Sequence, residues 1–494
     1  MSNPHHSGWL GQSPKTTIAL ATMLAILAVP YLSPRLARFR VARAPWDKTE
    51  AKDDAKVADA PALTQGETQL KASQNEKTVT NALPDDSASK AKELDPKLLA
   101  KTKGSIAIED ASGRALDAFY TQLAKTKAKQ PGAVTRVMHY GDSVVTSDYI
   151  TGTMRRRMQA DFGDAGHGFL LTANPWEWYF HNDVGHGAGE GWSSSRIVGP
   201  LTKDGMYGLG GVSFSGSPGA SAWFSTNEKG SYGKNVSRFD VYYLETETGG
   251  TVEVKIRGSD KSETFDTKGT GGKVSRVRSF PVEDGEAKMS LRVTSGNPRI
   301  FGVALERDEP GVVYDALGSN GARSEHWGAM DGAHWADQMA LRKPALIVLQ
   351  YGTNESETGI VSSEVYEKTL KGVIDKLKVA APHASILIAG PLDRAETKEG
   401  GGLRTKPIIK KLVACQKNAA KDNAIAFFDT YEAMGGENSM ATWVKKGLGG
   451  GDLTHPTPQG AEVLGDLLYK SLSTGFEAWL SKNPSAASTD AGAK

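Results

Sequence analysis

Four short polar motifs carry the residues of this chain that could do covalent chemistry. They are "YGDS" (140–143), "GSNGARS" (318–324), "YGTNES" (351–356) and "GGGDLTHPTPQGAEVL" (449–464). Each motif lies at the exit of a predicted strand or at the entrance of a predicted helix, and ligands of α/β sheets bind at such strand exits. A serine hydroxyl in this setting needs a base, a group that orients the base, and donors for the developing oxyanion.

Asp452 and His455 are spaced so that a short turn lets the carboxylate reach the Nδ1–H of the imidazole. That contact would fix the tautomer and leave Nε2 to serve Ser143 as a general base. Each motif alone has a structural alternative. The triplet ending at Ser143 could be a turn or an N-cap, Gly321 a turn residue, Asn354 a loop residue that bonds its own backbone, and Asp-x-x-His a helix cap. The four motifs together favour a serine hydrolase.

The segments between these motifs predict two kinds of sheet. A helix at 108–127, a strand at 133–140 and a helix at 147–162 come first. Gly, Ser and Thr clusters then separate alternating runs that are typical of an antiparallel β-sandwich; examples are 238–247, 251–258 and 288–295. Short continuous apolar strands between helices follow and predict a parallel sheet; they are 311–317, 344–352, 384–390 and 424–429.

The predicted fold class is therefore α/β, a parallel sheet flanked by helices and interrupted by a β-sandwich. The first part of the α/β domain is expected at 104–171 and the second at 311–482, with the insertion at 172–310.

The composition and the chain ends narrow the choices further. Lys plus Arg (59) nearly balances Asp plus Glu (57), which gives no reason to expect a nucleic-acid partner. The single cysteine, Cys415, excludes an intramolecular disulfide. An apolar run at 16–32 predicts a membrane anchor or signal segment over 1–43. Residues 44–103 and 483–494 are polar and almost free of aromatic residues, which predicts a disordered linker and a disordered tail.

In this order, the four motifs resemble those of the SGNH (GDSL-type) hydrolase family. The resemblance implies a flavodoxin-like sheet and a reaction that needs no metal or cofactor. It implies Ser143 as the nucleophile, His455 as the base and Asp452 as its orienting group. The oxyanion hole would comprise the backbone N–H groups of Ser143 and Gly321 and the side-chain amide of Asn354. Gly318 is the alternative to Gly321.

A narrower resemblance is to peptidoglycan O-acetylesterases and O-acetyltransferases, in which a carbohydrate-binding-module-like sandwich interrupts the catalytic fold. It implies removal of O-acetyl groups from an envelope polysaccharide, with peptidoglycan the expected polymer, through an acyl-serine intermediate. Val144 stands where many such enzymes have histidine. Acetyl transfer by the same triad and a non-catalytic wall-binding role are the alternatives.

The expected partners are the acylated polysaccharide and, through the N-terminal segment, the membrane, and the expected location is the cell envelope with the catalytic domain in the periplasm. Four arginines after the apolar run argue for the opposite orientation by the positive-inside rule; they are Arg35, Arg38, Arg40 and Arg43.

Several other polar and aromatic residues could be structural or functional. Trp176, Trp178 and Tyr179 could form a core or a stacking surface for sugar rings. His326 and His334 would need a third ligand at metal spacing, which the sequence does not offer. His139 is expected to be a packed or hydrogen-bonded side chain. "GTGGKV" (269–274) is expected to be a hairpin turn within the sandwich.

Overall fold

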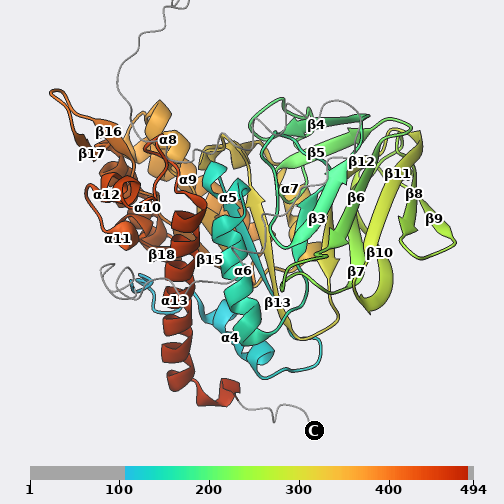
Figure 1. Cartoon of the computed structure of the whole chain (residues 1–494), viewed down its shortest axis with the longest axis horizontal. Helices are drawn as coiled ribbons and strands as arrows, with labels where there is room; N and C mark the ends of the chain where they lie inside the picture. The colour runs from blue at the N-terminus through green and yellow to red at the C-terminus, as the bar shows by residue number, and fades with distance from the viewer. Residues whose placement is uncertain (1–105, 488–494) are drawn as a thin grey trace, which may run out of the picture. The chain divides into compact units, whose positions relative to one another are not determined.

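The computed structural model of this protein describes residues 106–487 (Figure 1). The predicted anchor (1–43) and linker (44–103) lie outside the described residues, as does most of the predicted tail. Residues 484–487 of that tail form a short 3-10 helix, η5 (Pro484–Ala487). Within the described residues, no helix has the length and apolar character needed to cross a bilayer.

A five-stranded parallel sheet forms the centre of the α/β part, in the spatial order β13-β1-β14-β15-β18. Its strands are β1 (Val134–Gly141), β13 (Gly311–Gly318), β14 (Leu346–Gln350), β15 (Ser385–Ala389) and β18 (Ala426–Phe428). In chain order this is 2-1-3-4-5, the flavodoxin-like arrangement. The strand order therefore reverses at β1, where ligands of such folds bind.

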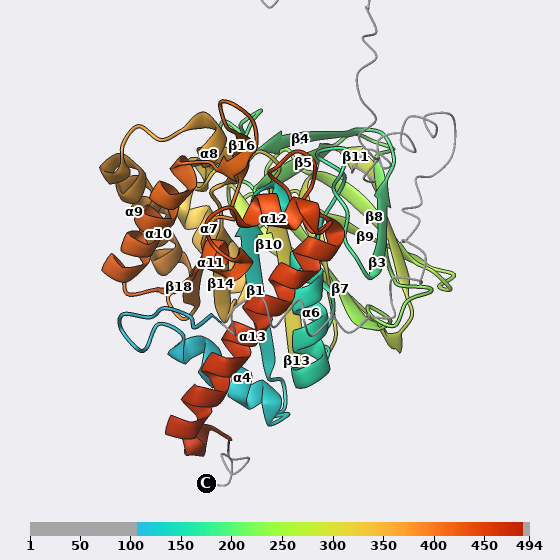
Figure 2. The ribbon, with the colours of Figure 1, turned by 60° about the vertical axis from the view of Figure 1, so that its left-hand side comes forward.

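Helices cover both faces of this sheet (Figure 1, Figure 2). One face packs against α4 (Asp117–Lys127), α6 (Tyr149–Phe162) and α13 (Pro458–Lys482), and the other against α7 (Gly332–Arg342), α9 (Ser363–Ala380) and α10 (Ile408–Asp422). Successive side chains along each strand point to opposite faces of the sheet, which produces two cores. On β1, Val137 faces the first helix set, whereas Met138 and Tyr140 face the second. Burial on both faces explains why the strands read as continuous apolar runs.

The predicted helix at 108–127 begins only at Asp117. The Asp110 carboxylate accepts hydrogen bonds from the backbone N–H groups of Ser112, Gly113 and Ala115, which holds the preceding residues in a turn. Glu109 instead forms a bridge with Phe427 at the end of the parallel sheet.

Two antiparallel sheets form the inserted sandwich. One has the order β10-β7-β12-β5-β4, with β2 also paired to β12, and the other has the order β3-β6-β11-β8-β9. The strands are β2 (Gly168–Leu171), β3 (Val184–Ala188), β4 (Trp192–Arg196), β5 (Val212–Gly216), β6 (Ser221–Thr226), β7 (Val236–Glu245), β8 (Gly250–Ile256), β9 (Ser262–Asp266), β10 (Val274–Gly285), β11 (Lys288–Gly296) and β12 (Arg299–Glu306). A third core fills the space between them.

Two details of the sandwich differ from the sequence-based expectation. Because β2 pairs with β12, the sandwich begins at Gly168, before the expected boundary at 172. The segment 269–274 is not a hairpin turn, since β9 and β10 lie in different sheets and this segment crosses between them. Lys273 in this connection forms an ion pair with Asp204 at 2.6 Å.

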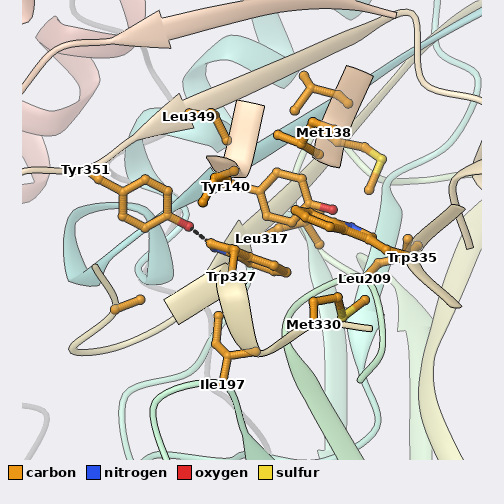
Figure 3. Close-up of a cluster of buried hydrophobic side chains, with 14 of the residues drawn as sticks. Met138, Tyr140, Ile197, Leu209, Leu317, Trp327, Met330, Trp335, Leu349 and Tyr351 are labelled. Carbon is orange, nitrogen blue, oxygen red and sulfur yellow. Dashed lines mark hydrogen bonds between the residues drawn. The ribbon is translucent and has the colours of Figure 1, made fainter. Parts of the chain in front are cut away.

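The sandwich and the parallel sheet share one core (Figure 3). Trp327 and Trp335 stack with ring centroids 5.1 Å apart, and Tyr140 meets Trp327 edge-on at 4.6 Å. Leu209 of the inserted region and Ile197 pack against the same cluster. Large aromatic rings therefore join the two parts of the chain.

A buried network of ion pairs also connects the sandwich to the parallel sheet. The guanidinium of Arg342 on α7 donates to Asp315 on β13 at 2.6 and 2.7 Å and to Glu306 on β12 at 2.6 Å. Arg136 on β1 donates to the second oxygen of Glu306 at 2.6 Å. Removing one partner would leave a buried charge uncompensated, so this network fixes how the sandwich attaches to the sheet.

Candidate active site

The nucleophile motif lies where β1 ends and a short helix, α5 (Ser143–Thr146), begins. Asp142 is the N-cap, and its carboxylate accepts from the backbone N–H of Val144 at 3.1 Å. A Cβ atom at Gly141 would come within 2.3 Å of the Val145 side chain, so glycine permits this sharp strand-to-helix turn. Ser143 is half-buried at the first helical position.

The structure brings Ser143, His455 and Asp452 together in one hydrogen-bonded line. Ser143 Oγ lies 2.7 Å from Nε2 of His455, and Nδ1 of His455 lies 2.6 Å from a carboxylate oxygen of Asp452. With the ring proton on Nδ1, the imidazole donates to Asp452 and Nε2 accepts from the Ser143 hydroxyl. This is the geometry in which a serine proton passes to histidine.

The loop that carries Asp452 and His455 is held by its own backbone. The other Asp452 oxygen accepts from the backbone N–H groups of Thr454 and His455, both at 3.0 Å, and the N–H of Gly450 donates to the His455 carbonyl at 2.7 Å. Partial burial would raise the pKa of Asp452, but hydrogen bonds from the His455 ring and from the backbone N–H groups of His455 and Thr454 outweigh it and lower the pKa to about 2. The carboxylate is therefore ionised at neutral pH.

The oxyanion candidates lie on the next two strand exits. Gly321 occupies the third position of a turn closed by the Ala322 N–H and the Ser319 carbonyl, and its φ of +75° suits a type II turn. Asn354 lies on α8 (Thr353–Thr358), and its amide donates to the Ala322 carbonyl at 2.8 Å. One amide hydrogen thus fixes the Asn354 side chain against the Gly321 turn and leaves the second for an oxyanion.

Gly318, the alternative to Gly321, has a structural role. A Cβ there would come within 2.4 Å of the Thr146 backbone nitrogen, so glycine permits the end of β13 to approach α5 closely.

A buried carboxyl group supports this oxyanion segment. Glu355 follows Asn354, and one of its carboxylate oxygens accepts from the Ser324 N–H at 3.0 Å and the Ser324 hydroxyl at 3.3 Å. Burial, together with the charge of Asp142, raises the pKa of Glu355 to about 7. No sequence pattern identifies Glu355, because its role depends on a contact with Ser324 that spacing does not reveal.

The aromatic span after β2 is mostly core. Trp176 and Tyr179 are buried, with 8% and 4% exposure, which favours the core interpretation of these two rings over a surface that stacks on sugar rings. Tyr179 uses its hydroxyl to accept from the Leu171 N–H at 2.7 Å and to contact His181 at 2.9 Å. Trp178 is 46% exposed and remains a candidate contact for substrate.

Three histidines outside the triad have structural partners. His139 lies between Tyr314 and Gln350 at 2.9 and 3.0 Å, and burial lowers its pKa to about 3. His334 contacts the Ser275 hydroxyl and the Tyr207 carbonyl. His326 accepts from the Arg323 N–H at 3.0 Å. Each ring thus has a hydrogen-bonding role in its local structure.

One buried group has ligand atoms close enough for a metal ion: Asp148, His167 and His181, whose atoms lie within 4.8 Å of one another. The Asp148 carboxylate, however, already accepts from Arg155 at 2.6 and 3.2 Å. It also accepts from Thr151 at 2.6 Å. A guanidinium in this position neutralises the carboxylate and opposes a second cation, which favours a structural role.

Comparisons with known proteins bear on the family and the fold of this chain. A model of the GDSL-like lipase/acylhydrolase family matches residues 285–463, a segment that includes Gly321, Asn354, Asp452 and His455. It begins after Ser143, because the inserted sandwich separates the first strand from the rest. No curated protein sequence matches the chain.

Two solved structures have similarity to this chain. A structure described as a peptidoglycan O-acetylesterase has a TM-score of 0.63 and 21% identity, and the match covers 75% of this chain and 99% of that one. A family two carbohydrate esterase from Cellvibrio japonicus has a TM-score of 0.24 and 12% identity, with coverage of 63% and 98%. The first likeness shows a shared fold, and the second is too distant to support an argument.

The family match, the flavodoxin-like strand order and the serine–histidine–aspartate line lead to one assignment. Residues 285–463 match a model of the GDSL-like lipase/acylhydrolase family, the fold resembles that of a peptidoglycan O-acetylesterase, and the chain is a serine esterase.

Proposed function

We propose that this protein removes O-acetyl groups from an envelope polysaccharide, with peptidoglycan as the polymer. The observation that carries the proposal is the line of hydrogen bonds from Ser143 through His455 to Asp452 at the strand-order reversal. Polymer and acyl group come from the likeness to the O-acetylesterase structure. The inserted sandwich fits a polymeric substrate, because it shares a core with the catalytic domain and is held rigidly beside it.

The proposed reaction has two halves. Ser143 Oγ attacks the acetyl carbonyl while Nε2 of His455 takes the serine proton, and Asp452 stabilises the resulting imidazolium. The tetrahedral oxyanion is bound by the N–H groups of Ser143 and Gly321 and by the Asn354 amide. His455 then protonates the departing sugar oxygen, which leaves an acetyl-Ser143 ester. In the second half, His455 removes a proton from water, and the hydroxide displaces the serine to release acetate.

The location of this activity is part of the proposal. O-acetylated wall polymer lies outside the cytoplasm, so the catalytic domain would work in the periplasm or at the cell envelope, retained by the segment at 1–43. The four arginines that follow the apolar run argue for the opposite orientation. A protease-protection assay on intact and permeabilised cells decides this point, since digestion in intact spheroplasts requires a periplasmic domain.

The direct test measures acetate released from O-acetylated peptidoglycan by the purified full chain, with the Ser143→Ala variant as the matched control. We expect release by the wild type and a loss of about 10⁶-fold in turnover in the variant, because the nucleophile is removed. Wild-type cleavage of a small activated acetate ester without release from the polymer would contradict the peptidoglycan assignment. Acetyl groups that move to added glycan acceptors instead of water would identify a transferase.

A further inference from the structure

One side chain outside the triad touches both halves of the active site. Arg394 lies in the segment that follows β15, at the same carboxyl end of the parallel strands as Ser143 and α8. Its Nε and one terminal nitrogen donate to the Thr454 hydroxyl at 3.1 and 2.8 Å. Thr454 lies between Asp452 and His455, so Arg394 binds the loop that carries the acid–base pair.

The other donors of Arg394 bind the oxyanion segment. One terminal nitrogen donates to the Thr353 carbonyl at 3.0 Å and to the Ser356 hydroxyl at 2.5 Å. The second terminal nitrogen also reaches the Glu357 carboxylate at 3.0 Å. Thr353 and Ser356 flank Asn354 on α8. All five N–H donors of the guanidinium are therefore used, and the fork spans the two segments.

The acceptors are arranged to receive these donors. The Thr454 hydroxyl gives its own proton to the Asp452 carbonyl at 3.1 Å, which leaves both lone pairs for Arg394. The Ser356 hydroxyl likewise donates to the Thr353 carbonyl at 2.6 Å. The backbone N–H of Ala395 adds a hydrogen bond to the Leu453 carbonyl at 3.0 Å. Each partner hydroxyl thus points its oxygen at the guanidinium.

The acid–base loop needs such an anchor. The side chains of Asp452 and His455 are 47% and 31% exposed, and a single polar contact at the surface fixes geometry weakly. Leu453 between them has a φ of +60°, a conformation that costs free energy for a residue other than glycine and must be held by its surroundings. The Arg394 side chain is only 12% exposed, so its hydrogen bonds form in a better shielded setting.

We propose that Arg394 is a positioning residue that sets the distance between His455 and the oxyanion donors by tying Thr454 to α8. The inference rests on the proposed reaction, in which both segments must meet one carbonyl carbon. Arg394 acts through Thr454 and Thr353 and does not touch the reacting atoms. A lysine would keep the charge but could not bind both segments at once, because its single ammonium lacks the planar fork.

The test is a double-mutant cycle of Arg394→Lys and Thr454→Val, measured as kcat and KM on a small activated acetate ester. We expect each single variant to lower kcat by about 10- to 100-fold, since a displacement of about 1 Å costs up to about 10²-fold, with KM within about twofold. The double variant should lose no more than the worse single variant, because both changes break the same tie. Arg404→Lys, at an exposed pair with Glu396, is the matched control and should retain wild-type kcat.

A second readout needs no turnover. The short hydrogen bond between His455 Nδ1–H and Asp452 gives a low-field proton resonance, which should broaden or disappear in Arg394→Lys while the protein remains folded by circular dichroism. An unchanged kcat together with an unchanged resonance overturns the proposal, as do fully additive losses in the double variant. If the wild type cleaves no ester, the proposed reaction fails, and retention of the resonance in Arg394→Lys still decides against the positioning role.

Discussion

Two aspartate–histidine groups lie close to the start of α5 and α6, and they are built in opposite ways. Asp452 and His455 are half-exposed, and the histidine ring connects a carboxylate to a serine hydroxyl. Asp148 and His181 are buried, and Arg155 rather than histidine holds the carboxylate. The same residue types therefore serve a reaction in one place and a scaffold in the other.

The difference lies in which group can change its charge. Burial lowers the pKa of His181 to about 4, because an imidazolium would lose its hydration there. Burial also lowers the pKa of the neighbouring His186 to about 3. In the Asp148 carboxyl the desolvation effect of burial is outweighed by the charge of Arg155, which lowers its pKa. A base must accept a proton during turnover, so the exposed histidine is suited to catalysis and the buried ones are suited to fixed hydrogen bonds.

The largest expected effect comes from breaking the exposed group. Asp452→Asn should lower kcat/KM for an ester substrate by about 10⁴-fold, because an amide no longer stabilises the imidazolium and favours the wrong tautomer. The unfolding free energy should fall by no more than about 2 kcal/mol, since the hydrogen bonds that lower the pKa of Asp452 are lost at a half-exposed site. Steady-state kinetics and urea denaturation of the same preparation measure both quantities. A variant that unfolds early with its turnover intact would reverse the assignment of roles.

The matching change in the buried group should have the opposite outcome. Asp148→Asn should lower the unfolding free energy by about 3–5 kcal/mol, because Arg155 keeps its charge and loses its closest partner. Asp183, at 3.8 Å from Arg155, compensates only in part. Urea denaturation is the measurement, and kcat of the folded fraction should stay within about threefold of wild type. Adding Arg155→Met should restore part of the lost stability, and a further loss would contradict a structural charge pair.

These two groups also show what the sequence could and could not predict. The Asp452–His455 contact is local, and the strand-exit rule places Ser143 at the same edge, so the line of three residues could be predicted from spacing. The parallel strands could be predicted because burial on both faces makes them continuous apolar runs. Asp148 and Arg155 are seven residues apart, a spacing that places both on one helical face. Their ion pair could therefore also be predicted from the spacing of opposite charges.

The remaining features depend on contacts between distant segments. Trp176 and Tyr179 could have been surface or core, because aromatic rings serve both, and only the fold decides that they are buried. Arg394 contacts Thr454, which lies 60 residues later in the sequence, and no sequence periodicity predicts such a contact. The start of the sandwich at Gly168 follows from the pairing of β2 with β12, which no local pattern specifies.

A third carboxyl group, Glu355, sharpens the comparison because it is buried and no cation pairs with it in the described part of the chain. Within the described part of the chain, Glu355 forms no ion pair, and burial raises its pKa to about 7. The folded state thus binds the proton more tightly than the unfolded state, where a glutamate pKa is about 4.3. The stability from this group is complete below about pH 4 and is lost as the pH rises through 7.

Glu355→Gln removes this titration while it keeps an oxygen that can accept from the Ser324 N–H. The difference in unfolding free energy, variant minus wild type, should rise by about 2–3 kcal/mol as the pH increases from 4.5 to 8.5. Urea denaturation across this range measures the difference, and Glu357→Gln, at an exposed carboxylate paired with Arg394 and Lys406, should not show the same rise. A difference that stays constant with pH would mean that Glu355 is ionised throughout, and the contrast between carboxylates with and without a buried cation would fail at this site.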